Sequence, residues 1–220
     1  MTERPILFSG PMVRAIITGH KTVTRRLITV PWGKKGRALP FPPYYDGGDG
    51  TLHVADEYGD WHDFAKHVRC PYGRAGDRLW VRETWQVVTG WQVGDLGAAV
   101  RYQDMGIKAC QMPEDKALPL CLTWDRWRPS IHMPHWASRL TLEVTGIRVE
   151  RLQELTGEDA LAEGVTLPPG GKAETFAILR HARSSFASLW DEISGDRPGA
   201  SWEANPWVWV ISFRRVEVAP

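Results

Sequence analysis

The sequence predicts an α+β fold with more strand than helix. Stretches that alternate β-branched or aromatic residues with polar ones recur along the 220 residues, and such alternation favours strands. Two segments, 155–165 and 174–193, show helical spacing instead. Insertions are predicted at about 31–74, where the sequence is rich in Pro and Gly, and at about 90–125, where it shows little regular periodicity. No repeat or clear linker divides the chain, so we expect residues 1–220 to form a single domain.

The N-terminal third alternates short helix and strand. Pro11 to Gly19 predicts a short helix, since proline suits a first turn and glycine a C-terminal stop. The segment KTVTRRLITV predicts a strand, which places Lys21 and Thr22 at a helix-to-strand junction. Further strands are expected at 51–55 and 60–64, from the turn at 76–77 through Glu83, and at 98–102.

The C-terminal part begins with RLTLEVTGIRVERL, which predicts one long strand or two strands joined near Gly146. LTGEDALAEGV predicts a short helix, with Thr156 as N-cap and acidic residues in the first turn. Residues 174–193 have a broad apolar helical face. WVWVISFRRVEV predicts the closing strand, where Trp207 and Trp209 are expected to pack in the core.

Composition excludes several classes of protein. A net charge of +1 gives no global basic field, so any nucleic-acid binding has to come from a local patch. No apolar stretch is long enough for a signal peptide or a membrane span. Three cysteines without a CxxC pair predict reduced thiols, and hence a cytoplasmic protein. We expect no cofactor.

The strongest constellation is GHKTVTRR followed, some fifty residues on, by GDRLWVRE. Alternation places Thr22, Thr24 and Arg26 on one strand face, with Lys21 at the turn before it. Such groups can hold a polar, planar or anionic ligand. The second strand adds further candidate ligand-contacting residues: Arg82, Glu83 and Trp85. The alternative is a solvated strand face with salt bridges.

GxKTxTxR followed by GDxLxVRE resembles the ASCH family, which shares the PUA-like barrel. The likeness covers 10–27, 76–85, 140–165 and 207–216. The long middle segments, with RWRPSIHMPHWASR, resemble only larger prophage-associated members. The resemblance implies a small, mostly antiparallel PUA-like β-barrel with flanking helices and long insertions. It also implies phage or prophage origin and the cytoplasm of a bacterial host.

The resemblance also implies chemistry. Some small ASCH proteins are similar to amidohydrolases that remove the acetyl group from N4-acetylcytidine with a lysine, a threonine and a glutamate. Lys21 and Thr24 match the first two, with Thr24 as nucleophile and Lys21 activating it if burial and neighbouring arginines lower its pKa. Alignment puts Gly157 at the glutamate position, so Glu158 and Glu83 are the candidates.

RWRPSIHMPHWASR mixes cations with an aromatic residue, as single-strand RNA sites do, and adds Arg128 and His132 to the candidate ligand-binding residues. The alternative is a rigid loop that plugs the core with tryptophan. Two histidines three residues apart are weak evidence for zinc, and we expect no metal.

Three functional hypotheses follow. The first is recognition of RNA or a modified nucleoside without turnover. The second is an enzyme, namely an amidohydrolase on an N4-acylated cytidine-like nucleoside or a ribonuclease. The third is a protein–protein interaction module of a phage. The choice between them depends on how the candidate side chains are held.

Overall fold

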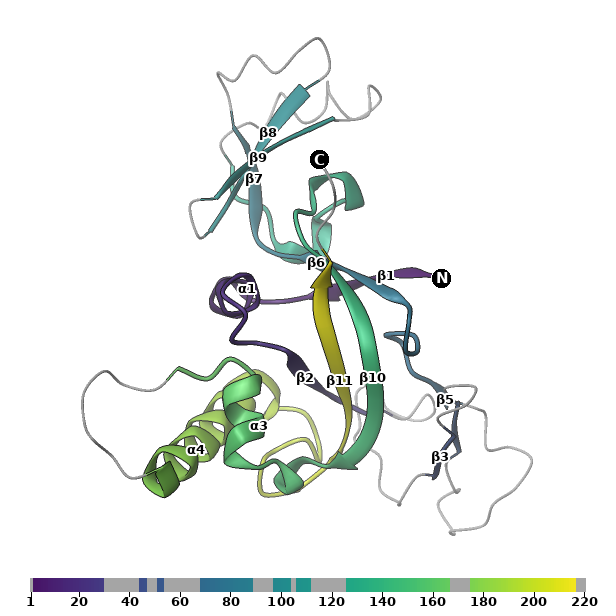
Figure 1. Ribbon diagram of the computed structural model, residues 1–220, viewed down its shortest axis with the longest axis vertical. Coiled ribbons are helices and arrows are strands. Elements are labelled where there is room, and N and C mark those ends of the chain that lie inside the picture. Colours follow the sequence, from purple (N-terminus) through teal and green to yellow (C-terminus); the bar gives the residue numbers. More distant parts are fainter. Residues whose placement is uncertain are drawn as a thin grey trace. The chain divides into compact units, whose positions relative to one another are not determined.

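The computed structural model describes residues 2–29, 44–46, 51–53, 68–88, 97–103, 106–111, 126–166 and 175–216 (Figure 1). The chain divides into two compact units. The first comprises Met1–Thr18, Asp77–Glu143 and Arg215–Pro220, and the second comprises Gly19–Gly76 and Val144–Arg214. Both units contain strands and helices, which confirms the mixed character of the fold.

The first unit contains a small sheet and a three-stranded antiparallel sheet. In the small sheet, β1 (Glu3–Leu7) pairs in parallel with β6 (Arg78–Arg82), and β6 pairs antiparallel with the start of β10 (Thr141–Arg151). Helix α1 (Gly10–Ile17) follows β1 and has Pro11 in its first turn. The other sheet has the order β7-β8-β9, with bounds Trp85–Val88, Gly97–Tyr102 and Ile107–Gln111.

Two short 3-10 helices, η1 (Ser130–His132) and η2 (His135–Ala137), lie in the RWRPSIHMPHWASR stretch. Met133 and Ala137 from this stretch are buried with the apolar side chains of β7 and β8. The Tyr102 hydroxyl donates a hydrogen bond to the Ala137 carbonyl at 2.7 Å. Part of this stretch is therefore core packing of the first unit.

The second unit contains β2 (Val23–Leu27), β11 (Trp207–Val216, of which the first eight residues belong here) and the remainder of β10, in the order β10-β11-β2. β11 and β2 pair antiparallel, with Val210 opposite Arg25 and Ile211 opposite Thr24. A separate antiparallel sheet has the order β3-β4-β5, with bounds Tyr44–Asp46, Thr51–His53 and Val68–Arg69.

Helices α3 (Gly157–Ala162) and α4 (Thr175–Ser194) pack on one another in the second unit, after the 3-10 turn η3 (Leu152–Glu154) (Figure 1). Thr156 caps α3: its hydroxyl accepts from the Asp159 N–H, and the Asp159 carboxylate accepts from the Thr156 N–H. The core beneath is apolar: Leu152, Leu155, Ala160, Ala182, Phe186, Trp190, Val208 and Val210.

Most elements match the sequence predictions. The helices near 11–19, 155–165 and 174–193 are present, and the long strand near Gly146 is one strand rather than two. Strand β1 was not anticipated. The strand expected at 60–64 lies outside the described residues. Pairing among the described strands shows no closed barrel, so the barrel and the single domain stay predictions.

Candidate functional site

Lys21 is the buried centre of the candidate site in the second unit. It is only 3% exposed, just before β2. Its ammonium donates three hydrogen bonds: to the Glu163 carboxylate Oε2 at 2.7 Å, to the Glu163 carbonyl at 2.7 Å and to the Val23 carbonyl at 2.9 Å. An ammonium has three donors, and each has an acceptor here.

Burial lowers the pKa of Lys21 below its usual value of 10.5, because desolvation disfavours the charged amine. The Glu163 carboxylate opposes this by attraction and hydrogen bonding, and the like charges of Arg26 and Arg25 lower the pKa further. The net direction is downward. This is the condition under which the sequence argument expected the lysine to serve as a base.

Glu163 is the carboxylate that sequence reasoning missed. It is the C-cap residue of α3, it is 4% exposed, and it forms a β-bridge with Lys21. Glu158, the candidate chosen from the same segment, lies exposed on α3. A usable signal was present: lysine side chains commonly bind the last carbonyls of a helix, which points to the end of α3 rather than its first turn.

The threonines and Arg26 of the motif differ in exposure. Thr24 is 4% exposed, one residue into β2, whereas Thr22 is exposed and Arg26 is half-buried. The Thr22 N–H donates to the Ala162 carbonyl at 2.9 Å, and the Thr22 carbonyl accepts from the Phe213 N–H at 2.9 Å. The main chain around Lys21 is thus fixed on one side by α3 and on the other by β11.

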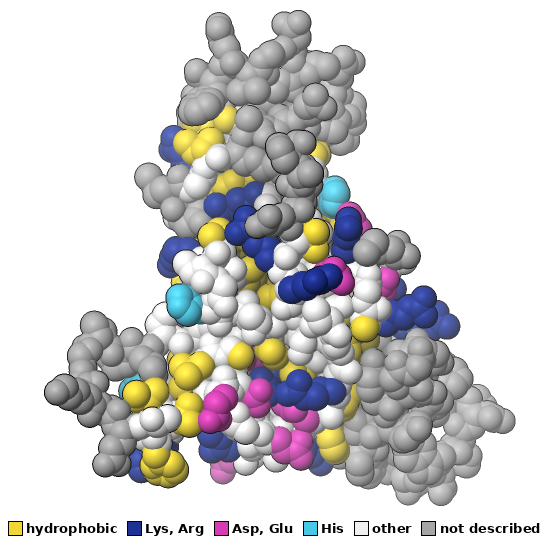
Figure 2. All heavy atoms as spheres, viewed as in Figure 1, with side chains coloured by type: hydrophobic (Ala, Val, Ile, Leu, Met, Phe, Trp, Pro, Cys, Tyr) yellow, Lys and Arg dark blue, Asp and Glu magenta, His cyan; other side chains and the backbone are white. Residues whose placement is uncertain are grey.

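Charged side chains at the outer part of this site balance one another. On the face in view, Figure 2 shows acidic and basic groups intermixed over the part of the second unit that holds α3, without a patch of one sign. Arg148 is 49% exposed and its Nε donates to the Glu150 carboxylate at 3.0 Å. The described residues of the second unit therefore show no broad phosphate-binding surface on this face.

The remaining predicted site residues lie in the first unit. Glu83 is 1% exposed and accepts two hydrogen bonds from Arg139, at 2.9 and 2.8 Å, in a bidentate pair. Arg82 lies over the Trp80 ring at 4.6 Å and donates to the Ile131 carbonyl at 3.3 Å. Trp85 is 2% exposed and contacts Trp136 edge to face, so the structure places it in the core.

Arg128 and His132 also lie in the first unit. Arg128 exchanges main-chain hydrogen bonds with Trp85 at 2.8 and 3.2 Å, and its guanidinium lies 5.1 Å from that ring's centroid. Burial and, less strongly, the Arg126 charge lower the pKa of Arg128. His132 is exposed, as are Arg126 and Trp127, which is 43% exposed. Their role as ligand contacts stays a prediction.

Two properties of the described residues bear on partners. No helix among them combines the length and apolar character needed to cross a membrane. No group of three or more His, Cys, Asp or Glu side chains in the described ranges is arranged to hold a metal ion.

Comparison with known proteins does not assign this chain to a family. No family model matches the chain, and no curated protein matches it. One solved structure resembles it, the high-resolution crystal structure of an ASCH domain from Lactobacillus crispatus JV V101. The alignment covers 97% of this chain and 79% of that chain at 11% identity, with a TM-score of 0.35. A likeness of this strength carries no argument, so membership of the ASCH family and a phage origin stay predictions, and function has to be argued from the site.

Proposed function

We propose that the chain hydrolyses an amide on a modified nucleoside of the N4-acylated cytidine kind, with Thr24 as nucleophile and Lys21 and Glu163 moving protons. The observation that carries the proposal is the buried Lys21–Glu163 pair at 2.7 Å. Of the two glutamates expected from the sequence, Glu158 is exposed and Glu83 lies in the first unit, whereas Glu163 contacts Lys21 directly. Replacing a buried ion pair with apolar residues is often neutral or stabilising, so stability alone is a poor reason to have one here.

The roles follow from the chemistry of each group. A lysine with a lowered pKa can take the proton of the Thr24 hydroxyl, and the resulting alkoxide attacks the amide carbonyl. The carbon–nitrogen bond then breaks and the amine leaves with a proton from the Lys21–Glu163 pair. Water hydrolyses the acyl-threonine ester to release a carboxylic acid. Glu163 holds the lysine in place and can exchange its proton.

The test is incubation of the purified protein with N4-acetylcytidine and a panel of modified nucleosides, followed by chromatography. We expect deacylation that is abolished by Lys21→Ala and Thr24→Val and reduced at least about 100-fold by Glu163→Gln, as for a lost general acid–base group. Glu158→Gln separates the two candidate glutamates, and little change is expected because that side chain is exposed. Absence of conversion of every nucleoside, with wild-type protein that is folded, would refute the proposal.

A specific observation favours a second candidate, recognition without turnover. All three Lys21 donors already have acceptors, which is how a purely positional ammonium is held. In that case the site binds RNA or a modified nucleoside and releases it unchanged. Titration with labelled nucleoside and single-stranded RNA distinguishes this outcome: binding lost in Lys21→Ala, without product at any time, supports recognition alone.

A further inference from the structure

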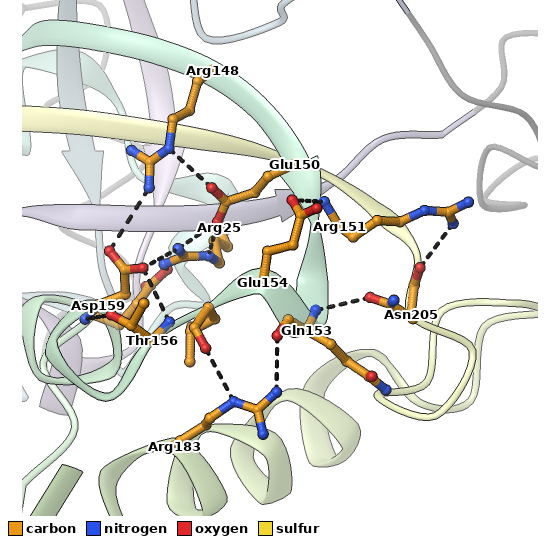
Figure 3. Close-up of polar contacts among 12 residues, drawn as sticks. Arg25, Arg148, Glu150, Arg151, Gln153, Glu154, Thr156, Asp159, Arg183 and Asn205 are labelled. Carbon is orange, nitrogen blue, oxygen red and sulfur yellow. Dashed lines mark hydrogen bonds and ion pairs between the residues drawn. The ribbon is translucent and has the colours of Figure 1, made fainter. Parts of the chain in front are cut away.

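Arg25 is an internal cation surrounded by carboxylates. Its side chain is 0% exposed. Its guanidinium contacts Glu150 through Nε at 2.9 Å, Asp159 through Nη2 at 3.1 Å and Glu163 through Nη1 at 3.4 Å. Figure 3 shows Arg25 pointing between the Glu150 and Asp159 carboxylates, with Arg148 bonded to the same two from the outer side. β2, β10 and α3 each contribute at least one of these residues.

The charges of this cluster balance. Three cations, Lys21, Arg25 and Arg148, lie among three carboxylates, Glu150, Asp159 and Glu163. A buried charge is tolerated when it is paired and hydrogen-bonded, and a balanced cluster meets that condition. Removing a buried member therefore changes the field at the others, whereas the charge of the half-exposed Arg148 is screened by solvent.

The two arginines have different contacts. Arg148 is half-exposed, and the ion pairs it makes in the described part of the chain are with Glu150 and Asp159. Arg25 also reaches Glu163, at Oε1, whereas Lys21 bonds the other oxygen, Oε2. The carboxylate of Glu163 is thus held by one cation at each oxygen. This arrangement sets both the position and the rotation of the group that faces Lys21.

We propose that Arg25 is a positioning residue for the Lys21–Glu163 pair: it holds Glu163 by Oε1 so that Oε2 meets the lysine. This inference rests on the function proposed above and adds to it a residue that touches no substrate. Arg25 acts from the interior, because its guanidinium is fully covered.

The electrostatic effect of Arg25 has a definite sign. Among the described residues, the charged groups that shift the pKa of Lys21 are Glu163 at the end of α3, which raises it, and Arg26 and Arg25 on β2, which lower it. Loss of Arg25 removes a like charge and leaves Glu150 and Asp159 with one cation fewer, so both effects raise the pKa of Lys21. At a pH below that pKa, each unit of increase lowers the fraction of neutral amine about tenfold.

The experiment compares Arg25→Met with Arg148→Met, a matched control that removes a cation from the same carboxylates but not from Glu163. Arg25→Lys keeps the positive charge but lacks the planar guanidinium that donates to several carboxylates at once. If Arg25→Met fails to fold, Arg25→Met with Glu150→Gln removes one charge of each sign and is used in its place. Two readouts are taken from each variant: the pH profile of kcat/KM with N4-acetylcytidine, and the titration of the Lys21 Nζ by NMR, assigned with Lys21→Arg.

We expect Arg25→Met to move the acidic limb of the profile and the Lys21 titration upward together, by about one pH unit, with about tenfold lower kcat/KM below the limb. Arg25→Lys should restore part of the shift, and Arg148→Met should leave both midpoints within about 0.3 unit of wild type. An unmoved Lys21 titration in folded Arg25→Met, or an equal shift in Arg148→Met, would overturn the inference. If the wild type shows no turnover, the proposed function fails, and the NMR titration alone still decides the role of Arg25.

Discussion

Replacing Glu163 by leucine tests how strongly the buried lysine depends on its partner. The change leaves the Lys21 ammonium, 3% exposed, without an opposite charge at its hydrogen-bonding distance. Removing one partner of a buried pair costs about 3–5 kcal/mol. Two carbonyl acceptors remain on Lys21, each worth about 1 kcal/mol, and the amine can also deprotonate. We therefore expect the lower end, about 3 kcal/mol.

The assay is urea unfolding at pH 7, followed by tryptophan fluorescence, within a double-mutant cycle. Lys21→Met combined with Glu163→Leu removes both charges, so no ion is left unpaired. The double variant should lie about 2–3 kcal/mol closer to wild type than the sum of the two single changes. A loss below about 1 kcal/mol for Glu163→Leu, or strict additivity, would refute the view that this pair is buried and coupled.

Two further predictions concern packing and pH. In Gly157→Ala the new Cβ would lie 2.6 Å from the Leu179 carbonyl oxygen and 2.7 Å from the Leu179 Cα, so α4 has to shift. We expect the free energy of unfolding, measured by thermal denaturation, to fall by about 1–3 kcal/mol. Gly146→Ala is the control: its Cβ has open space around it, and the change should alter stability by less than about 1 kcal/mol. The pKa of Lys21 is lower in the folded chain than its usual 10.5, so between those two pKa values the unfolded chain binds more protons than the folded chain. The free energy of unfolding should therefore rise with pH in that window. A Lys21→Met variant whose stability rises equally steeply with pH would contradict this.

Local sequence signals predicted much of the fold. The Thr156 cap, the first-turn proline of α1 and the alternation in β10 and β11 are features of short segments, and each produced the expected element. β1 was missed because ERPIL is short and carries a proline at its centre, which is tolerated in an edge strand, and β1 is at the edge of its sheet among the described strands. The role of such a strand depends on its partner, which the segment does not specify.

The site residues chosen from the sequence stay predictions. Lys21 and Thr24 were chosen from the motif, and their burial in the second unit is consistent with that choice. Glu163 was missed because the glutamate position of the small enzymes aligns with Gly157, at the start of α3 and six residues before Glu163. Five residues along a helix turn the side chain by about 140°, so Glu158 and Glu163 cannot share a face. Arg25 lies within GHKTVTRR, and its burial among carboxylates depends on tertiary contacts that no local pattern reveals.

Glu163 offers Lys21 two acceptors, its side-chain carboxylate and its own main-chain carbonyl, and it does so from the last turn of α3. The lysine is therefore bound to the end of a helix as well as to a side chain. Fraying of that turn would withdraw both acceptors at once, so assembly of the pair is coupled to local folding of six residues. Hydrogen exchange at the Glu163 and Gly164 amides, which bond to Asp159 and Leu161 carbonyls, would measure how often the site comes apart in the native chain.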